Sequence, residues 1–458
     1  MRSGAKSQPM FAVQKAKSWR PATSESEIET RMRMKSGWAL ALAVTSLLVF
    51  NSCSSSKNAV TGTGIVWVAT TGDQMITTFT INESSGSNSQ VGNGTASGAQ
   101  PSKMLMTADR KYLFVANIDA SDSTCGASNS FCNEVRAFTV NSDGTLKALG
   151  NPVVVSPAAT SPQGSQLGLA VDPKGSFLFV TNEGNSGVLG QVGTVAGTIS
   201  VLSISTSGLT LSSSVASTVP GDFAGNGPSD VAVAPVGNFL YVANRFTNTV
   251  AVFSYDTSAG TITAPPFASY STGTSPAALA FSKCAGGNAV NTNCTASDGD
   301  NLFVANSGLS NNISIFSACI EVTPTCPTAD GSLQQVSGSP VSANGIGPTS
   351  FIVHPLLNFV YVVDTQSNEI SQFKYSPATG LLTALSPATV STGTAPGPGG
   401  ITSDGGFVMV PDSGGSQIDI YRVNNTTSST GSGVTGRLSR PSTSSITLGA
   451  QPTAAVVR

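Results

Sequence analysis

One apolar hexamer occurs seven times along the 458-residue chain, and this repetition limits the possible folds more than any other feature. Measured at the valine that all copies share, neighbouring copies lie 47 to 65 residues apart. Repeats of this order are typical of propellers and solenoids, in which each repeat is one supersecondary unit. The copies are Ile65–Thr70, Tyr112–Asn117, Phe177–Asn182, Phe239–Asn244, Asn301–Asn306, Phe359–Asp364 and Phe407–Asp412.

Each hexamer has similar neighbours in the sequence. A short strand that opens on proline precedes it, as in PSDVAVAP (228–235), and an alternating strand follows it, as in VAVFSYD (250–256). A turn with glycine and a fourth short strand come next, as in DTSAGTIT (256–263). The hexamer is apolar at successive positions, which predicts burial on both faces, whereas alternation in the next strand predicts one buried face. Four antiparallel strands per unit describe a propeller blade.

The two ends of the repeated region complement each other. The chain finishes on QPTAAVVR (451–458), which matches QPSKMLMT (100–107), the first strand of a unit. The first hexamer, in contrast, has no proline strand before it. The last strand can therefore complete the first blade, closing the ring and removing exposed sheet edges. We predict an all-β fold, a seven-bladed β-propeller over 63–458 with four antiparallel strands per blade.

Residues 1–52 are predicted to be a leader outside this fold. A basic stretch precedes an apolar run over 38–50, in the order of a secretory signal peptide. The run has thirteen residues, fewer than the roughly 20 that span a bilayer. The residues before it are unusual for a signal, so the true start is expected at Met32 or Met34.

The apolar run ends near Cys53, and a Ser-rich tether over 53–62 follows. This segment resembles a bacterial lipoprotein signal, in which the cysteine is lipidated and begins the mature chain. Phe50 stands where that motif usually has leucine. The resemblance implies a lipid anchor at Cys53 and export to the bacterial cell envelope, in the periplasm or at the outer membrane or cell surface. An ordinary cleaved signal and a one-span anchor are the alternatives.

The other six cysteines form three pairs that are close in sequence. All lie in stretches rich in Gly, Ser, Asn or Pro, and an exported chain enters an oxidising compartment, so three local disulfides are expected. A metal site is the rival interpretation, but the chain has no CxxC and a single histidine. We therefore expect no metal and no cofactor. The pairs are Cys125 with Cys132, Cys284 with Cys294, and Cys319 with Cys326.

The YVAN-type hexamer, the proline strand before it and the seven copies together resemble the seven-bladed lactonase-like propellers and the YVTN-repeat propellers. The resemblance covers about 63–458, nearly the whole mature chain, and it implies the propeller fold. The lactonase-like family includes enzymes that open sugar lactones, so the resemblance also implies lactone hydrolysis as one possible activity. Propeller folds host unrelated functions, which makes the fold the stronger expectation.

The family hallmark is Gly-Pro-Arg-His, a short strand and a Tyr-Val-x-Asn-Glu-Leu segment, and this chain departs from it. The nearest counterparts are GPSDVAVAP with LYVANRF, and GPTSFIVHP with VYVVDTQ. Asp230 and Ser350 stand there in the histidine position, and Arg245 and Thr365 in the glutamate position. Glu183, in FVTNEG, is the residue that echoes the Asn-Glu pair, although a turn carboxylate is the other interpretation.

The histidine position of every unit would face one mouth of a central channel lined by first strands. Four of these seven residues are Gly or Ala, which leaves few groups for acid–base chemistry. His354, the single histidine, falls within a strand and is interpreted as structural, which also disfavours a Ser-His-Asp triad. The candidate channel residues are Lys103, Asp230, Arg245 and Glu183. The seven positions are Lys103, Gly168, Asp230, Ala278, Ser350, Gly400 and Ala454.

Charge is sparse, at 10% of residues. Eight basic and three acidic residues lie in 1–52, which leaves 14 basic and 21 acidic ones in the body and no basic stripe for nucleic acid. The few channel charges and the cysteine-braced loops favour a monomeric binding or interaction module with an unknown protein or carbohydrate ligand. It would contact membrane only through its lipid anchor. The alternatives are a sugar-lactone hydrolase of the 6-phosphogluconolactonase type and a carbohydrate-binding propeller.

Overall fold

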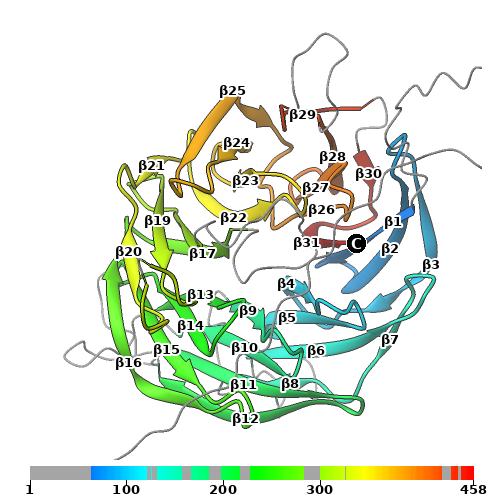
Figure 1. Cartoon of the computed structure of the whole chain (residues 1–458). Helices are drawn as coiled ribbons and strands as arrows, with labels where there is room; N and C mark the ends of the chain where they lie inside the picture. Colours follow the sequence, from blue (N-terminus) through cyan, green and yellow to red (C-terminus); the bar gives the residue numbers. More distant parts are fainter. Residues whose placement is uncertain are drawn as a thin grey trace, which may run out of the picture. The chain divides into compact units, whose positions relative to one another are not determined.

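Seven antiparallel sheets surround a common axis, which confirms the seven-bladed β-propeller (Figure 1). Each sheet has four strand positions from the axis to the rim, and the described residues contain no helix long and apolar enough to cross a membrane. All seven sheets belong to the compact unit Asn58–Arg458. The computed structural model describes residues 63–120, 125, 131–156, 167–184, 197–216, 227–282, 300–324, 326–424, 435–441 and 445–458.

The innermost strand of each blade faces the axis and in five blades opens on proline. Proline suits the first position of a strand, because its missing N–H is then no loss to the ladder. The innermost strand of the seventh blade has only two residues, since the segment before it alternates proline and glycine. These strands are β4 (Pro101–Met106), β9 (Leu167–Val171), β13 (Pro228–Val233), β17 (Pro276–Phe281), β22 (Pro348–Val353), β26 (Gly400–Ile401) and β31 (Pro452–Val457).

The repeated hexamer forms the second strand of every blade, and it is buried at nearly every position, as its continuous apolar pattern predicts. It lies inside its sheet and between two neighbouring sheets, so both of its faces are covered. These strands are β1 (Thr63–Thr70), β5 (Tyr112–Ala120), β10 (Phe177–Asn182), β14 (Phe239–Asn244), β18 (Asn301–Asn306), β23 (Phe359–Asp364) and β27 (Phe407–Asp412).

The third strands differ from the prediction of one buried face. In β19 and β24 four successive residues are buried, because these strands also lie between neighbouring sheets, and exposure begins only near the strand ends. These strands are β2 (Met75–Asn82), β6 (Cys132–Val140), β11 (Thr198–Ser205), β15 (Thr249–Tyr255), β19 (Asn312–Ala318), β24 (Glu369–Tyr375) and β28 (Gln417–Val423).

The outermost strands form the rim and are largely exposed, as in β3. In three blades this position is divided between two short strands that both pair with the third strand. The unbroken strands are β3 (Asn88–Ala96), β12 (Gly208–Ala216), β16 (Ile262–Ser271) and β25 (Leu382–Ser391). The divided ones are β7 (Leu146–Ala148) with β8 (Val153–Val154), β20 (Leu333–Gln335) with β21 (Val341–Ser342), and β29 (Leu438–Ser439) with β30 (Ser445–Thr447).

The ring closes as the sequence predicts. The last strand, β31, pairs antiparallel with β1 and so becomes the innermost strand of the first blade. The register places Val66 opposite Val457 and Val68 opposite Ala455. Figure 1 shows the C-terminal strand at the axis beside the first strands of the chain.

The hydrophobic core is divided among the interfaces between blades. One apolar cluster lies between each pair of neighbouring blades, including the pair that closes the ring. Burial of a large apolar side chain contributes about 1.5–3 kcal/mol relative to its exposure. Each blade is therefore stabilised on both faces by its neighbours, and the inner strands are fixed around the axis.

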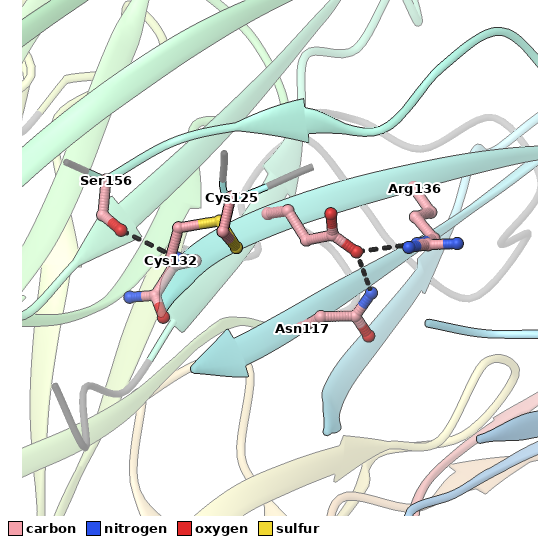
Figure 2. Close-up of a disulfide and its surroundings, with 7 residues drawn as sticks. Asn117, Cys125, Cys132, Arg136 and Ser156 are labelled. Atoms are coloured by element: carbon pink, nitrogen blue, oxygen red, sulfur yellow. Dashed lines mark hydrogen bonds and ion pairs between the residues drawn. A yellow bond between two sulfur atoms is a disulfide. The ribbon is translucent and has the colours of Figure 1, made fainter. Parts of the chain in front are cut away.

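Two of the three expected disulfides lie among the described residues, and both are present. Cys125 and Cys132 have Cα atoms 5.5 Å apart, and Cys319 and Cys326 have theirs 5.4 Å apart, as a disulfide requires. Figure 2 shows the first of them at the beginning of β6. The expected third pair, Cys284 and Cys294, and the lipidation candidate Cys53 lie outside the described residues.

Candidate functional site in the central cavity

A cavity of about 850 Å³ lies at the axis, lined by residues of the innermost strands. This volume is within the range of small-molecule sites, about 300–1,000 Å³. Residues from β4, β13, β17, β22, β26 and β31 contribute to its wall, together with Leu167 and Leu169 of β9. The ring of blades therefore encloses a space for a small molecule rather than a fully packed axis.

Lys103 and Asp230 form an ion pair in this cavity. The Lys103 Nζ donates to the Asp230 Oδ1 at 2.5 Å, and the backbone N–H of Leu279 donates to the Asp230 Oδ2 at 2.9 Å. The Lys103 side chain is 28% exposed and that of Asp230 5%. The carboxylate is thus held from two sides, while the Lys103 side chain remains partly exposed in the cavity.

The pair spans two blade boundaries, because β4 belongs to the second blade and β13 to the fourth. Gly168, at the corresponding level of the third blade, makes this possible. A Cβ atom at residue 168 would lie 2.6 Å from the Asp230 Cα and 2.8 Å from its Oδ1, closer than side chains tolerate. The glycine therefore leaves the space in which the lysine reaches the carboxylate.

Six of the seven expected ring positions occupy equivalent places, but Gly400 does not. Lys103 stands opposite Ala116, the fifth residue of its hexamer, after a bulge that follows the proline. Gly400 stands opposite Met409, the third residue of its hexamer, so it lies two residues further along the inner strand than the position equivalent to Lys103. In the seventh blade Pro396 takes the place of the strand's first proline, since it bridges Asp412. Pro398 therefore occupies the position equivalent to Lys103. Gly400 was expected there because it stands two residues after Pro398, whereas the proline that begins this inner segment is Pro396.

Hydroxyl groups surround the Lys103–Asp230 pair at the mouth of the cavity. Ser229 donates to the carbonyl of Pro276 at 2.6 Å, and Thr365 to that of Pro396 at 3.0 Å, so these hydroxyls also link neighbouring blades. Ser350, in the hallmark histidine position, lines the same cavity, and its Oγ has no hydrogen-bond partner among the described residues. The cavity-lining hydroxyl residues are Ser102, Ser229, Thr349, Ser350, Thr365 and Ser413.

Arg245 and Glu183 form a second ion pair, with 3.5 Å between Nη1 and Oε1. They follow β14 and β10 respectively, so the pair links the fourth and third blades. Their side chains are 29% and 6% exposed. Neither residue is among those that line the cavity. The four candidate residues thus divide into one pair in the cavity and one pair outside it.

His354 is fully buried at the end of β22 and takes no part in the cavity wall. Its Nδ1 accepts the backbone N–H groups of Leu356 and Leu357 at 3.1 and 3.0 Å. The ring also lies so close to Gly405 that a Cβ there would be 2.2 Å from it. These contacts fix the turn that follows β22, as expected for a structural histidine.

The recurrent residue at the end of the hexamer is also structural where the structure shows its contacts. Asn117 is fully buried, and its Nδ2 donates to the Glu134 Oε1 at 2.9 Å, which also accepts from the Arg136 Nε at 2.7 Å (Figure 2).

No group of three or more His, Cys, Asp or Glu residues that could hold a metal ion occurs in the part of the chain described here.

Comparison with known proteins agrees with this architecture. Residues 188–290 match the family model described as Lactonase, 7-bladed beta-propeller. No curated protein matches the sequence. The lactonase-type propeller expected from the hexamers is thus supported by a family match in this segment and by the observed seven blades.

Solved structures share the fold across nearly their full length. A candidate 6-phosphogluconolactonase of Bacteroides fragilis has 18% identity and a TM-score of 0.64, and the match covers 88% of this chain and 99% of that one. A candidate 6-phosphogluconolactonase of Bacteroides uniformis has 16% identity and a TM-score of 0.64, with 86% and 99% covered. The periplasmic gluconolactonase of Pseudomonas aeruginosa has 17% identity and a TM-score of 0.63, with the same coverage.

These findings correct the expectation of a binding module. The match of residues 188–290 to the lactonase family model favours the alternative interpretation, a lactone hydrolase, over a propeller that only binds. The expectation rested on the cysteine-braced loops and on the scarcity of charge around the channel. Scarcity is a poor argument, because acid–base catalysis needs one or two positioned groups, and Lys103 and Asp230 are positioned in the cavity.

Proposed function

We propose that this protein is a lactone hydrolase and that the reaction takes place in the central cavity. The observation that carries the proposal is the Lys103–Asp230 ion pair in a cavity of small-molecule size. The match of 188–290 to the lactonase family model supports it. Ring-opening of a cyclic ester needs a base and a group that stabilises an oxyanion, and the carboxylate and ammonium groups of this pair can serve as these two groups.

The two residues have complementary roles in this reaction. Asp230 accepts a proton from a water molecule while the water oxygen attacks the lactone carbonyl carbon. Lys103, which lines the cavity, donates a hydrogen bond from its Nζ to the oxyanion that forms. The ring C–O bond then breaks, and the departing alkoxide takes the proton from Asp230. One water molecule is consumed, and the product is a hydroxy acid.

Substitution of the pair tests the proposal. We expect Asp230→Asn to lower kcat for a hydrolysed lactone at least about 100-fold, because a positioned general base contributes roughly 10²–10⁴-fold. Lys103→Met should lower kcat by a similar factor, because it removes the hydrogen bond that stabilises the oxyanion. The measurement is titration of released acid at constant pH over a panel of sugar and alkyl lactones.

The chain provides a matched control in a second Lys–Asp pair, Lys111 and Asp109, which lies 2.9 Å apart and is exposed. Lys111→Met and Asp109→Asn should leave hydrolysis within about two-fold of the original rate, because exposed pairs contribute little. Equal activity in Asp230→Asn and in the original protein would refute the assignment of the base. Absence of hydrolysis of every lactone would refute the proposed function.

We further propose that the protein is exported and attached to the cell envelope through a lipid on Cys53, as a monomer that meets the membrane only at this anchor. The leader over 1–52 supports this, and so do the two short-range disulfides, which persist in oxidising compartments. Mass spectrometry of the N-terminus from bacterial cells should find a diacylated or triacylated Cys53. An N-terminus upstream of residue 53 would contradict the proposal.

A further inference from the structure

We propose that the substrate of this cavity is an uncharged lactone with an aliphatic tail, rather than a phosphorylated sugar lactone. This inference rests on the proposed lactone hydrolysis and adds the chemical class of the substrate. Its basis is the distribution of polar and apolar groups along the axis, together with the charge of the cavity wall.

The wall changes character from the mouth inward. Hydroxyl groups and the Lys103–Asp230 pair occupy the first levels of the inner strands. One level deeper the strands present apolar residues, since Leu169, Val231 and Phe351 stand opposite the hexamer valines. The deeper cavity-lining residues are also apolar or glycine: Leu105, Met106, Ile352, Val353, Gly400, Ile401, Val456 and Val457.

This gradient suits a ligand with a polar head and an apolar tail. A lactone ring held at the level of Lys103 would have its carbonyl at the ammonium group, and a substituent on the ring would extend along the strands. Three residues separate this level from Met106 and Ile401, which corresponds to about 10 Å at 3.3 Å per residue. An extended tail of about six to eight carbons fits this length.

The charge of the wall argues against a phosphate group. Lys103 and Asp230 are the charged residues among those that line the cavity, and each neutralises the other. A phosphate dianion requires several donors and uncompensated positive charge. The segments within 121–444 that the structure does not describe contain one basic residue, Lys283, and no arginine. A phosphorylated ligand would therefore leave much of its charge unpaired in an apolar cavity.

The experiment compares the full chain on four δ-lactones: unsubstituted valerolactone, dodecalactone with a seven-carbon tail, gluconolactone and 6-phosphogluconolactone. We expect kcat/KM to rise by up to about three- to four-fold for each added methylene, as burial of a CH₂ predicts. We expect 6-phosphogluconolactone to be at least about ten-fold poorer than gluconolactone. Best hydrolysis of the phosphorylated lactone would overturn this inference and leave lactone hydrolysis standing.

Calorimetric binding separates the two proposals. If none of the lactones is hydrolysed, the proposed function fails, and binding of dodecalactone against valerolactone decides the substrate class. Binding of dodecalactone at least about ten-fold tighter supports the tail-binding cavity. Equal affinity for both compounds, or no binding of dodecalactone, contradicts it.

Two substitutions place the tail in the cavity. Leu105→Asn and Ile401→Asn introduce an amide on the second and the seventh blade, on either side of the first, and each should lower the dodecalactone-to-valerolactone ratio of kcat/KM at least about five-fold. Leu211→Asn, on β12 at the rim, provides the control, since Leu211 is 44% exposed and lies outside the cavity. Thermal unfolding verifies that each variant is folded. An unchanged ratio in both cavity variants would contradict the proposed position of the tail.

Discussion

At the scale of single residues, Asp364 is the least expected buried group. It ends the sixth hexamer, where four earlier copies end on asparagine, and it is fully buried. Its Oδ2 accepts a hydrogen bond from the Ser371 Oγ, while its Oδ1 has no partner among the described residues. The pKa of Asp364 is raised to about 7, mainly by burial and in part by the nearby Glu369, while the hydrogen bond from Ser371 acts in the opposite direction. The folded protein therefore keeps this carboxyl protonated under mildly acidic conditions.

This raised pKa predicts that stability falls as pH rises. Between the ordinary aspartate pKa of 3.8 and about 7 the folded state holds a proton that the unfolded state has lost, so the free energy of unfolding decreases through this window. Asp364→Asn introduces the residue that four other hexamers carry at this position. We expect its free energy of unfolding, relative to that of the original protein, to rise by on the order of 3–4 kcal/mol between pH 4 and pH 8. Urea unfolding of both proteins at several pH values measures the difference.

Asp412 provides the control for this prediction. It ends the seventh hexamer, but its Oδ1 accepts the Gly415 N–H at 2.8 Å and its Oδ2 accepts from Gln417 at 3.1 Å. Asp412→Asn removes a carboxylate that makes two hydrogen bonds. The free energy of unfolding of this variant, relative to that of the original protein, should therefore not rise with pH as it does for Asp364→Asn. A constant difference between Asp364→Asn and the original protein across the pH range would show that Asp364 does not titrate in this window.

The sequence indicates Lys103 and Asp230 as channel residues, because each stands two positions after the proline of an inner strand. It does not indicate that the two meet, since they belong to blades separated by a third. Their contact depends on Gly168, and the absence of a side chain there has meaning only in the assembled ring. Gly400 failed as a prediction because two prolines, Pro396 and Pro398, offered two alignments.

At the scale of strands, the hexamer pattern predicts position and burial correctly but not the contacts between blades. The third position of the hexamer is aromatic in six of seven copies. Where the aromatic side chain carries a hydrogen-bond donor, it donates to a turn of the next blade. Trp67 Nε1 donates to the Gly144 carbonyl at 2.7 Å, and Tyr241 OH donates to the Gly331 carbonyl at 2.9 Å. Burial raises the pKa of Tyr241, so its hydroxyl remains a donor.

The burial of the third strands was missed for a related reason. Alternation of polar and apolar residues predicts one solvated face for an isolated sheet. In the ring both faces of a sheet are covered by neighbouring blades, and small polar residues such as Ser314 and Ser371 are buried among them. Local sequence reports the period of a strand, whereas burial here is decided by the stacking of whole blades.

At the scale of the whole molecule, the strength of the ring depends on its closing strand. β31 supplies the innermost ladder of the first blade, and Ala454 and Ala455 are 1% and 5% exposed. The same strand contributes Ala455, Val456 and Val457 to the cavity wall. Closure of the propeller and construction of the proposed substrate site are therefore performed by the same residues.

Deletion of 451–458 should open the ring. It removes the register from Val66–Val457 to Thr70–Pro452 and exposes the edge of β1. With about 1 kcal/mol for each lost ladder hydrogen bond, the loss of about 5 kcal/mol is comparable to the whole stability of many domains. We expect the truncated chain to unfold at least about 10 °C below the full chain and to lose lactone hydrolysis. A synthetic peptide of sequence QPTAAVVR should restore both properties, whereas a scrambled peptide should not. Identical melting of the truncated and full chains would mean that the first blade does not need its fourth strand, and the ring would then be held by the interfaces between blades alone.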